Sequence, residues 1–134
     1  QDFIEKTAAD PNRVDCMIVL KESDKVIGDI AINNYSSINR SASIRIAIYD
    51  KPSLGRGYGS EAMLLLLKHG FHEMNLHRID LNVFSYNERA IKTYEALGFQ
   101  VEGRQRDAIF LNNRYYDSVL MSILEDEFNS RHSI

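Results

Sequence analysis

The sequence contains a single cysteine, Cys16, so no disulfide can form within the chain. A chain without disulfides suits a reducing compartment, and we expect a cytoplasmic protein. No apolar run approaches the ~20 residues that cross a bilayer, and no signal peptide is visible, so we expect no membrane partner. The histidines, cysteine and carboxylates show no metal-ligand spacing, and we expect no metal site.

An excess of positive charge is also missing. The 16 lysines and arginines are outnumbered by 19 acidic residues, which gives a formal net charge of -3. A nucleic-acid-binding domain normally has a strongly basic surface, so we expect no nucleic-acid partner. The length of 134 residues, with 44% apolar and 26% charged residues, fits one globular domain with one core. We therefore expect a single domain over residues 1–134.

Apolar periodicity predicts the secondary structure. Alternating apolar residues indicate half-buried strands, and apolar residues three and four positions apart indicate helices. Residues 10–12 fit a turn. The expected order is β-β-β-α-β-α-β-β, with strands at 16–20, 26–32, 42–48, 79–83, 99–110 and 115–124, and helices at 60–74 and between Asn87 and Gly98.

Three local signals refine this order. Asn87 can cap the second helix, and Gly98 is the expected stop signal after it. Asn112-Asn113 fits a hairpin turn between the last two strands. The strand–helix–strand unit over 44–83 should pair its two strands in parallel through a right-handed crossover. A mostly antiparallel sheet with two helices is an α+β arrangement.

A glycine-rich turn, Gly55-Arg56-Gly57-Tyr58-Gly59, leads into the first expected helix. Glycines let the backbone approach a ligand closely, and the first helical turn presents unpaired N–H groups at the positive end of the dipole. Together these features predict a phosphate site, with Arg56 as a nearby cation. A tight strand-to-helix turn without a ligand stays open. The endings typical of a P-loop and of a dinucleotide fingerprint are absent.

The segment from Asn87 to Phe99 follows the pattern N-x-x-A-I-x-x-Y-E-x-L-G-F. Together with the glycine turn, it resembles the GNAT superfamily of acetyl-CoA-dependent N-acetyltransferases. Residues 112–121 resemble the branch with ribosomal-protein N-terminal and spermidine N-acetyltransferases. The resemblance implies a mixed, mostly antiparallel twisted sheet flanked by helices, with the N-terminal strand and helices shortened. It also implies acetyl transfer to a primary amine by direct attack in a ternary complex.

The resemblance assigns roles to individual residues. Tyr94 matches the tyrosine that protonates the departing thiolate in many members of the family. The coenzyme A pyrophosphate would lie on the backbone of the glycine turn, the pantetheine arm on two diverging strands, and Asn87 would contact the cofactor. The implied cofactor-binding residues are Ile46, Ala47, Ile48, Arg56, Gly57, Tyr58, Gly59, Ser60, Asn82 and Asn87. Arg89 and Lys92 fit a solvated helix face, although either could meet the 3′-phosphate.

The sequence departs from the family pattern at two positions. Leu54 replaces the glutamine or arginine of the glycine motif, and Ser43 stands where a glutamate often serves as general base. Three carboxylates are candidate bases by chemistry alone: Asp29, Asp50 and Asp117. The histidines on or just after the first helix are interpreted as structural: His69, His72 and His77.

Alternatives stay open at this stage. Tyr94 shares a helical stripe with Ala90, Ile91 and Leu97 and could simply belong to the core. The domain could also be a non-catalytic acyl-CoA-binding or protein-interaction module of the same fold. The acceptor could be a small-molecule or peptide amine, and part of its groove could come from the second subunit of a homodimer.

Overall fold

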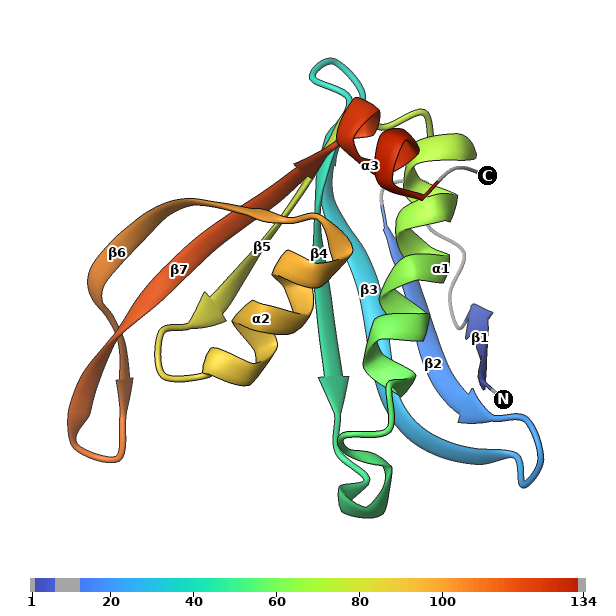
Figure 1. Cartoon of the computed structure of the whole chain (residues 1–134), viewed down its shortest axis with the longest axis horizontal. Helices are drawn as coiled ribbons and strands as arrows, with labels where there is room; N and C mark the ends of the chain where they lie inside the picture. The colour runs from blue at the N-terminus through green and yellow to red at the C-terminus, as the bar shows by residue number, and fades with distance from the viewer. Residues whose placement is uncertain (1, 7–12, 133–134) are drawn as a thin grey trace.

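A computed structural model describes residues 2–6 and 13–132 of the chain (Figure 1). The described residues form one seven-stranded sheet with the strand order β1-β2-β3-β4-β5-β7-β6. The predicted turn at residues 10–12 lies outside the described residues. The elements in chain order are β1 (Asp2–Lys6), β2 (Val14–Leu20), β3 (Lys25–Ser36), β4 (Ser41–Ile48), the 3₁₀ turn η1 (Lys51–Ser53), α1 (Tyr58–His72), β5 (Arg78–Phe84), α2 (Glu88–Leu97), β6 (Gln100–Leu111), β7 (Arg114–Leu124) and α3 (Glu125–Arg131).

The sheet is antiparallel except between β4 and β5, which pair in parallel. This confirms the α+β class and the parallel pairing predicted for the unit over 44–83. The parallel register joins Ser41–Ser43 to Arg78–Asp80 and then stops. Figure 1 shows the two strands spreading apart beyond that point, with α2 in front of the widening gap. This divergence is the structural feature that opens the candidate site.

The core lies between the sheet and the helices, with α1 and α2 on the same face of the sheet (Figure 1). Helix α1 buries a stripe at helical spacing, which includes Met63, Leu67 and Phe71. On β4, Ala42 and Ile44 are buried against this stripe, while the alternate residues face the other side. The apolar stripe of α1 and the alternating apolar residues of β4 therefore pack together in one core layer.

The predicted helix and turn signals are found in place. The side-chain oxygen of Asn87 accepts a hydrogen bond from the Ala90 N–H at 3.2 Å and caps α2. Gly98 ends that helix in the left-handed region, with φ of 115°. Asn112 and Asn113 both have positive φ, 51° and 63°, as the tight hairpin between β6 and β7 requires.

Strand β1, helix α3 and the short 3₁₀ turn η1 were not predicted. Strand β1 pairs antiparallel with β2, but the sequence Asp2-Phe3-Ile4-Glu5-Lys6 shows no apolar alternation. Helix α3 follows β7 with no turn residue between them, which hides its start. Its signal is local: the side chain of Glu127 accepts a hydrogen bond from the Leu124 N–H at 3.0 Å, and Phe128 buries its ring 5.1 Å from Phe71. No helix among the described residues is long and apolar enough to span a bilayer.

Candidate functional site

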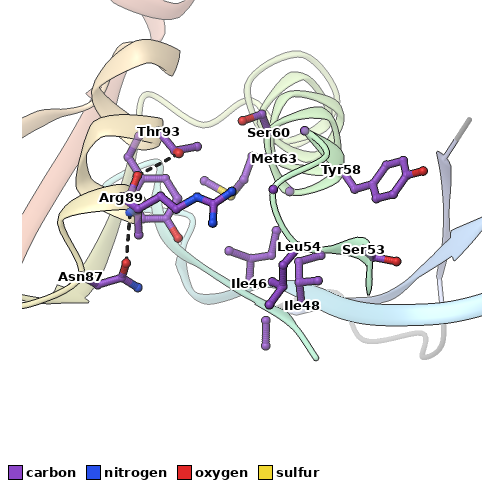
Figure 2. A pocket seen from close by; sticks show the side chains of 16 residues that line it. Ile46, Ile48, Ser53, Leu54, Tyr58, Ser60, Met63, Asn87, Arg89 and Thr93 are labelled. Carbon is purple, nitrogen blue, oxygen red and sulfur yellow. Dashed lines mark hydrogen bonds between the residues drawn. The ribbon is translucent and has the colours of Figure 1, made fainter. Parts of the chain in front are cut away.

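A groove of about 660 Å³ lies where the N-terminal end of α1 approaches β4 and α2 (Figure 2). Its volume is typical of a site for a small molecule or cofactor. Three elements form its walls, and several predicted site residues lie on them. Those on β4 are Ile46, Ala47 and Ile48, those on the glycine turn and α1 are Gly57, Tyr58, Gly59 and Ser60, and those next to or on α2 are Asn87 and Tyr94.

The exposed edge of β4 forms one side of this groove. Because the pairing with β5 stops at Ser43, the backbone groups of β4 that point toward β5 beyond it have no strand partner among the described residues. The opposite edge of β4 stays paired with β3 as far as Ile48, so the strand itself is rigidly held. Unpaired backbone N–H and C=O groups favour an extended ligand that carries amide groups.

The glycine turn presents the start of α1 to the same groove. Gly57 caps the helix in the left-handed region with φ of 83°, where a residue with a side chain is strained. A Cβ built on Gly57 would meet no atom within 4 Å, so this end of the helix faces open space. The helical hydrogen bonds begin with the Glu61 N–H, which donates to the Gly57 carbonyl at 3.1 Å. The N–H groups of the preceding turn are therefore available to an anion.

Arg89 reaches from α2 across to the glycine turn and stays exposed, so it fits both readings left open from the sequence, a solvated helix face and a cation that could meet the 3′-phosphate. A Cβ added to Gly55 would collide with Nη2 of Arg89, so the guanidinium lies directly against the turn. Figure 2 shows the side chain pointing from α2 toward the start of α1. A neighbouring cavity of about 690 Å³ is lined by Arg89, Lys92 and Ser60. The sequence could not show this, because helical periodicity does not identify the element that faces a charged residue.

Two predicted cofactor residues lie elsewhere. Nε of Arg56 donates to the Pro52 carbonyl at 2.9 Å, and Arg56 is not part of the described lining of the groove. Asn82 lines a different, smaller cavity and accepts a hydrogen bond from the Ser118 hydroxyl at 3.1 Å. Arg56 lies outside the groove lining because the Pro52 carbonyl of η1 accepts the hydrogen bond of its side chain. Asn82 lies outside it because β5 has already diverged from β4 at that residue.

The smaller cavity has a volume of about 300 Å³ and opens where β4 and β5 part. Its lining includes Ile44 and Ile46, which face the helices, but also Ser43 and Arg45, which alternate with them. Consecutive β4 residues together with Leu81 and Asn82 of β5 place this cavity along the edge where the two strands part, and the side chain of Ser43 alternates with those that face the helices. It shares Met63, Ile46 and Tyr94 with the large groove.

Tyr94 therefore stands at the boundary between the groove and the smaller cavity. Its ring packs on the core, with its centroid 6.0 Å from that of Phe99. Its hydroxyl has no hydrogen-bond partner within the described part of the chain. Burial raises the pKa of the Tyr94 phenol above its ordinary value of 10.0, so the hydroxyl is protonated at neutral pH. Tyr94 is half-buried and lines the groove, so this hydroxyl is open to a ligand atom.

The candidate bases named from the sequence are held in other pairs. The Ser53 hydroxyl, at 2.6 Å, and Lys25 lower the pKa of Asp50. Arg104, whose Nε lies 2.6 Å away, lowers the pKa of Asp117. Asp29 pairs with Arg45 at 3.1 Å. Within the described residues, none of these three carboxylates lines the groove or the smaller cavity.

The histidines at the far end of α1 support the fold. Nε2 of His72 lies 3.0 Å from the Asn129 amide oxygen, and Nδ1 of His77 lies 3.6 Å from the Glu125 carboxylate. Both contacts join α1 and its following loop to α3, away from the glycine turn. Among the described residues, no group of three or more His, Cys, Asp or Glu is arranged to hold a metal ion.

Comparisons with known proteins agree with this geometry. A family model described as an acetyltransferase (GNAT) domain matches residues 1–100. An uncharacterized N-acetyltransferase of Bacillus licheniformis, p20, is 36% identical over 113 residues, which are 83% of this chain and 62% of the relative. The spermidine N(1)-acetyltransferase of Vibrio cholerae is 32% identical over 114 residues, which are 84% of this chain and 65% of the relative.

Solved structures give the same result. The dodecameric spermidine N-acetyltransferase from Vibrio cholerae superposes with a TM-score of 0.85 at 29% identity, covering 92% of this chain and 71% of that chain. The fold expected from the glycine turn and the α2 segment is thereby confirmed. The chain spans less than two thirds of the length of the Bacillus licheniformis and Vibrio cholerae sequences that it matches.

Proposed function

The chain belongs to the acetyltransferase (GNAT) domain family, and from this premise we propose that it transfers the acetyl group of acetyl-CoA to a primary amine. The observation that carries the proposal is the position of Tyr94. Its protonated, unpartnered hydroxyl lies between a groove suited to a phosphate-bearing ligand and a smaller cavity at the gap between β4 and β5. Such a position is where a thiol leaving group would need a proton.

The groove offers each part of acetyl-CoA a complementary surface. The N–H groups at the start of α1 would bind the pyrophosphate, where the glycines leave room for close approach. Arg89 and Lys92 would add positive charge for further phosphate oxygens. The unpaired edge of β4 beyond Ser43 would hydrogen-bond the amides of the pantetheine arm. The thioester would then lie near Tyr94.

We propose a small-molecule amine as the acceptor, with spermidine as the first compound to test. The support is that the Vibrio cholerae relative is named a spermidine N(1)-acetyltransferase. The acceptor would enter through the smaller cavity. Acetyl-CoA and the amine would thus meet at the gap between β4 and β5, as a ternary complex requires.

The reaction would be a direct attack of the neutral amine on the thioester carbonyl. The C–N bond forms, the C–S bond breaks, and the departing sulfur takes a proton or a strong hydrogen bond from Tyr94. Positioning both substrates would supply much of the rate. An acyl-cysteine intermediate has no support, because Cys16 is buried in the core on β2 and does not line the groove.

The exposed edge of the sheet supports a homo-oligomer as the functional assembly. Strand β6 is the last strand of the sheet, and its surroundings expose Val101, Phe110 and Tyr115 at 52%, 61% and 61%. Long exposed edge strands with apolar residues tend to pair with another chain. The Vibrio cholerae relative forms a dodecamer. Light scattering after gel filtration should give a multiple of the chain mass of 15.4 kDa, and a monomer at all concentrations would refute this assembly.

The activity is tested by thiol release from acetyl-CoA with a panel of amines, namely spermidine, a dipeptide with a free N-terminus and glucosamine. Calorimetry with coenzyme A runs in parallel. The proposal predicts coenzyme A binding and thiol release that depends on at least one amine. Tight coenzyme A binding with no thiol release across the panel would instead favour a non-catalytic acyl-CoA-binding module. An absence of coenzyme A binding would refute both functions.

A further inference from the structure

Ser43 and Asp80 form the last residue pair of the parallel register between β4 and β5. The Ser43 hydroxyl donates a hydrogen bond to Oδ1 of Asp80, and the two oxygens lie 2.6 Å apart. This is a short, charge-assisted hydrogen bond. Directly beyond it the strands part and the smaller cavity begins, with Ser43 in its lining. The pair therefore stands at the point where the acceptor amine would meet the sheet.

The Asp80 carboxylate interacts more closely with Ser43 than with any cation among the described residues. Its nearest cationic neighbour, Arg78, has Nη2 at 3.4 Å from Oδ2 of Asp80, which is a loose contact. The same guanidinium makes two hydrogen bonds of 2.7 Å to Glu102 on β6. The positive charge of Arg78 is thus neutralised mainly by Glu102. Arg78 therefore competes little with Ser43 for the Asp80 carboxylate. Oδ1 of Asp80 is therefore held by the Ser43 hydroxyl, and Ser43 lines the smaller cavity.

Ser43 and Tyr94 line the same cavity of about 300 Å³ from different elements. Tyr94 carries a proton that it can give to the leaving sulfur, and Ser43 carries a hydroxyl backed by a carboxylate. A site with a proton donor and a proton acceptor facing one small space has the arrangement that acyl transfer to an amine requires. The three carboxylates considered from the sequence lie outside this space.

We propose that Ser43 and Asp80 act as a relay that accepts the proton of the attacking amine. This inference rests on the proposed acetyl transfer. As the C–N bond forms, the amine proton passes to Oγ of Ser43, and the hydroxyl proton of Ser43 passes to Oδ1 of Asp80. The C–S bond breaks, and the sulfur takes the Tyr94 proton. The carboxylic acid of Asp80 and the tyrosinate of Tyr94 then exchange a proton through solvent, which restores both groups.

The relay explains how a chain with serine at this position can manage without a carboxylate in direct contact with the amine. Once the amine nitrogen has attacked, it is a much stronger acid than a free alkylammonium, whose pKa is ~10. Its proton is therefore lost more readily at that stage, and the Ser43 hydroxyl, hydrogen-bonded to Asp80, is the group of the relay that would receive it. In this arrangement Ser43 contacts the substrate, and Asp80 acts through it.

The test uses the full chain with acetyl-CoA and spermidine, or whichever panel amine wild type acetylates. Asp80→Asn keeps the shape and the hydrogen bond to Ser43 but cannot accept a proton, and Ser43→Ala removes the hydroxyl. Ser43→Thr retains a hydroxyl and suits a strand. Asp24→Asn, in the turn between β2 and β3 with φ of 58°, is the matched control for removing one negative charge.

The relay predicts that Asp80→Asn and Ser43→Ala each lower kcat by about 100-fold, while coenzyme A affinity and the melting temperature stay unchanged. Ser43→Thr and Asp24→Asn should retain most of the turnover. Because the two residues act as one unit, the double variant Ser43→Ala/Asp80→Asn should be no slower than either single variant.

Several results would overturn the relay. Wild-type kcat in Asp80→Asn, losses that multiply in the double variant, or equal losses in Ser43→Thr and Ser43→Ala would each show that no proton passes along this path. A fall in kcat accompanied by an equal loss of coenzyme A affinity would assign Asp80 a structural role. If wild type releases no thiol with any panel amine, the proposed function itself fails, and the inference fails with it.

Discussion

Tyr94 combines a ring that packs on the core with a hydroxyl that has no partner among the described side chains. A purely structural tyrosine would either place its hydroxyl in water or bond it to a neighbour. Tyr94 has no such neighbour among the described residues, and it lines the groove and the smaller cavity, where its hydroxyl can meet either water or a ligand. A core role and a catalytic role for Tyr94 differ in whether turnover needs its hydroxyl oxygen.

Tyr94→Phe removes that oxygen and keeps the ring. We expect kcat to fall about 100-fold, because the leaving sulfur loses its proton donor. Coenzyme A affinity and the melting temperature should hardly change, since the packing of the ring remains. Steady-state kinetics and calorimetry on the same preparation measure both. Unchanged turnover would make Tyr94 a core residue only.

Arg89 is exposed, and the sequence left open both a solvated helix face and a contact with the 3′-phosphate. As a polar residue in the first turn of α2, it fits a solvated face equally well, and only the packing of α2 beside α1 brings it against Gly55. Arg89→Ala should weaken coenzyme A binding about tenfold or more, because a charge-assisted hydrogen bond to phosphate is lost. Arg106→Ala, on the exposed strand β6, is the control. Equal affinities of Arg89→Ala and Arg106→Ala in calorimetry would remove Arg89 from the site.

At the scale of the element, the turn before α1 does two tasks. It lets the chain reverse from β4 through η1 into the helix, and it leaves the helix start open to the groove. Gly55 and Gly57 both have positive φ, 76° and 83°, so the turn depends on glycine at these positions. The proposed phosphate site therefore depends on the whole turn and the start of the helix.

A comparison of Gly57→Asp with Gly57→Asn separates the effect of charge on coenzyme A binding from the effect of backbone strain. Both side chains tolerate positive φ better than other residues do, and nothing lies within 4 Å of the Cβ position. Asp should also favour the helix itself, through the dipole. We nevertheless expect Gly57→Asp to bind coenzyme A about tenfold more weakly than Gly57→Asn, since its carboxylate repels phosphate. Equal affinities in calorimetry would refute the phosphate assignment.

The strands β5, β6 and β7 are tied together by Glu102. Its carboxylate accepts hydrogen bonds from Arg78 on β5 and from the Ser122 hydroxyl on β7, and these lower the pKa of Glu102 from 4.5 to about 2. A carboxyl whose pKa is lowered by folding stabilises the fold above its unfolded value. The stabilisation is therefore complete above pH 4.5 and lost as the pH falls toward 2.

Glu102→Gln should lower the free energy of unfolding at pH 7 by about 1 kcal/mol or less, because the side chain is 37% exposed and solvent screens the pair. The variant should also lose less stability than wild type when the pH falls from 4.5 to 2. Urea denaturation at several pH values measures the difference. If the free energy of unfolding falls equally with pH in the two proteins, the Glu102–Arg78 pair contributes nothing to stability.

Periodicity was sufficient for α1, α2 and most strands, because each buries one face against a single core. It was insufficient for β1, whose short sequence has no alternation, and for α3, which begins directly at the end of β7. Spacing along the chain also could not show that Ser43 and Asp80 meet. They are 37 positions apart and become neighbours only through the parallel register.

At the scale of the molecule, the fold would separate the two proposed substrates. The groove lies between α1, α2 and β4, and the smaller cavity lies beside it at the gap between β4 and β5. Tyr94 and Ser43 lie at this gap, one on a helix and one on a strand. The parallel pairing of β4 and β5 over Ser41–Ser43 fixes the two strands beside the gap, which holds it open.

We propose that an amine is acetylated beside Tyr94, at the gap between β4 and β5. After incubation with acetyl-CoA and spermidine, free thiol is measured by a colour reagent and N-acetylspermidine by mass spectrometry. We expect equal amounts of thiol and acetylated amine in wild type, and about 100-fold slower formation of both in Tyr94→Phe. Thiol release without acetylated amine, or equal rates in the two proteins, would contradict acetylation at this place.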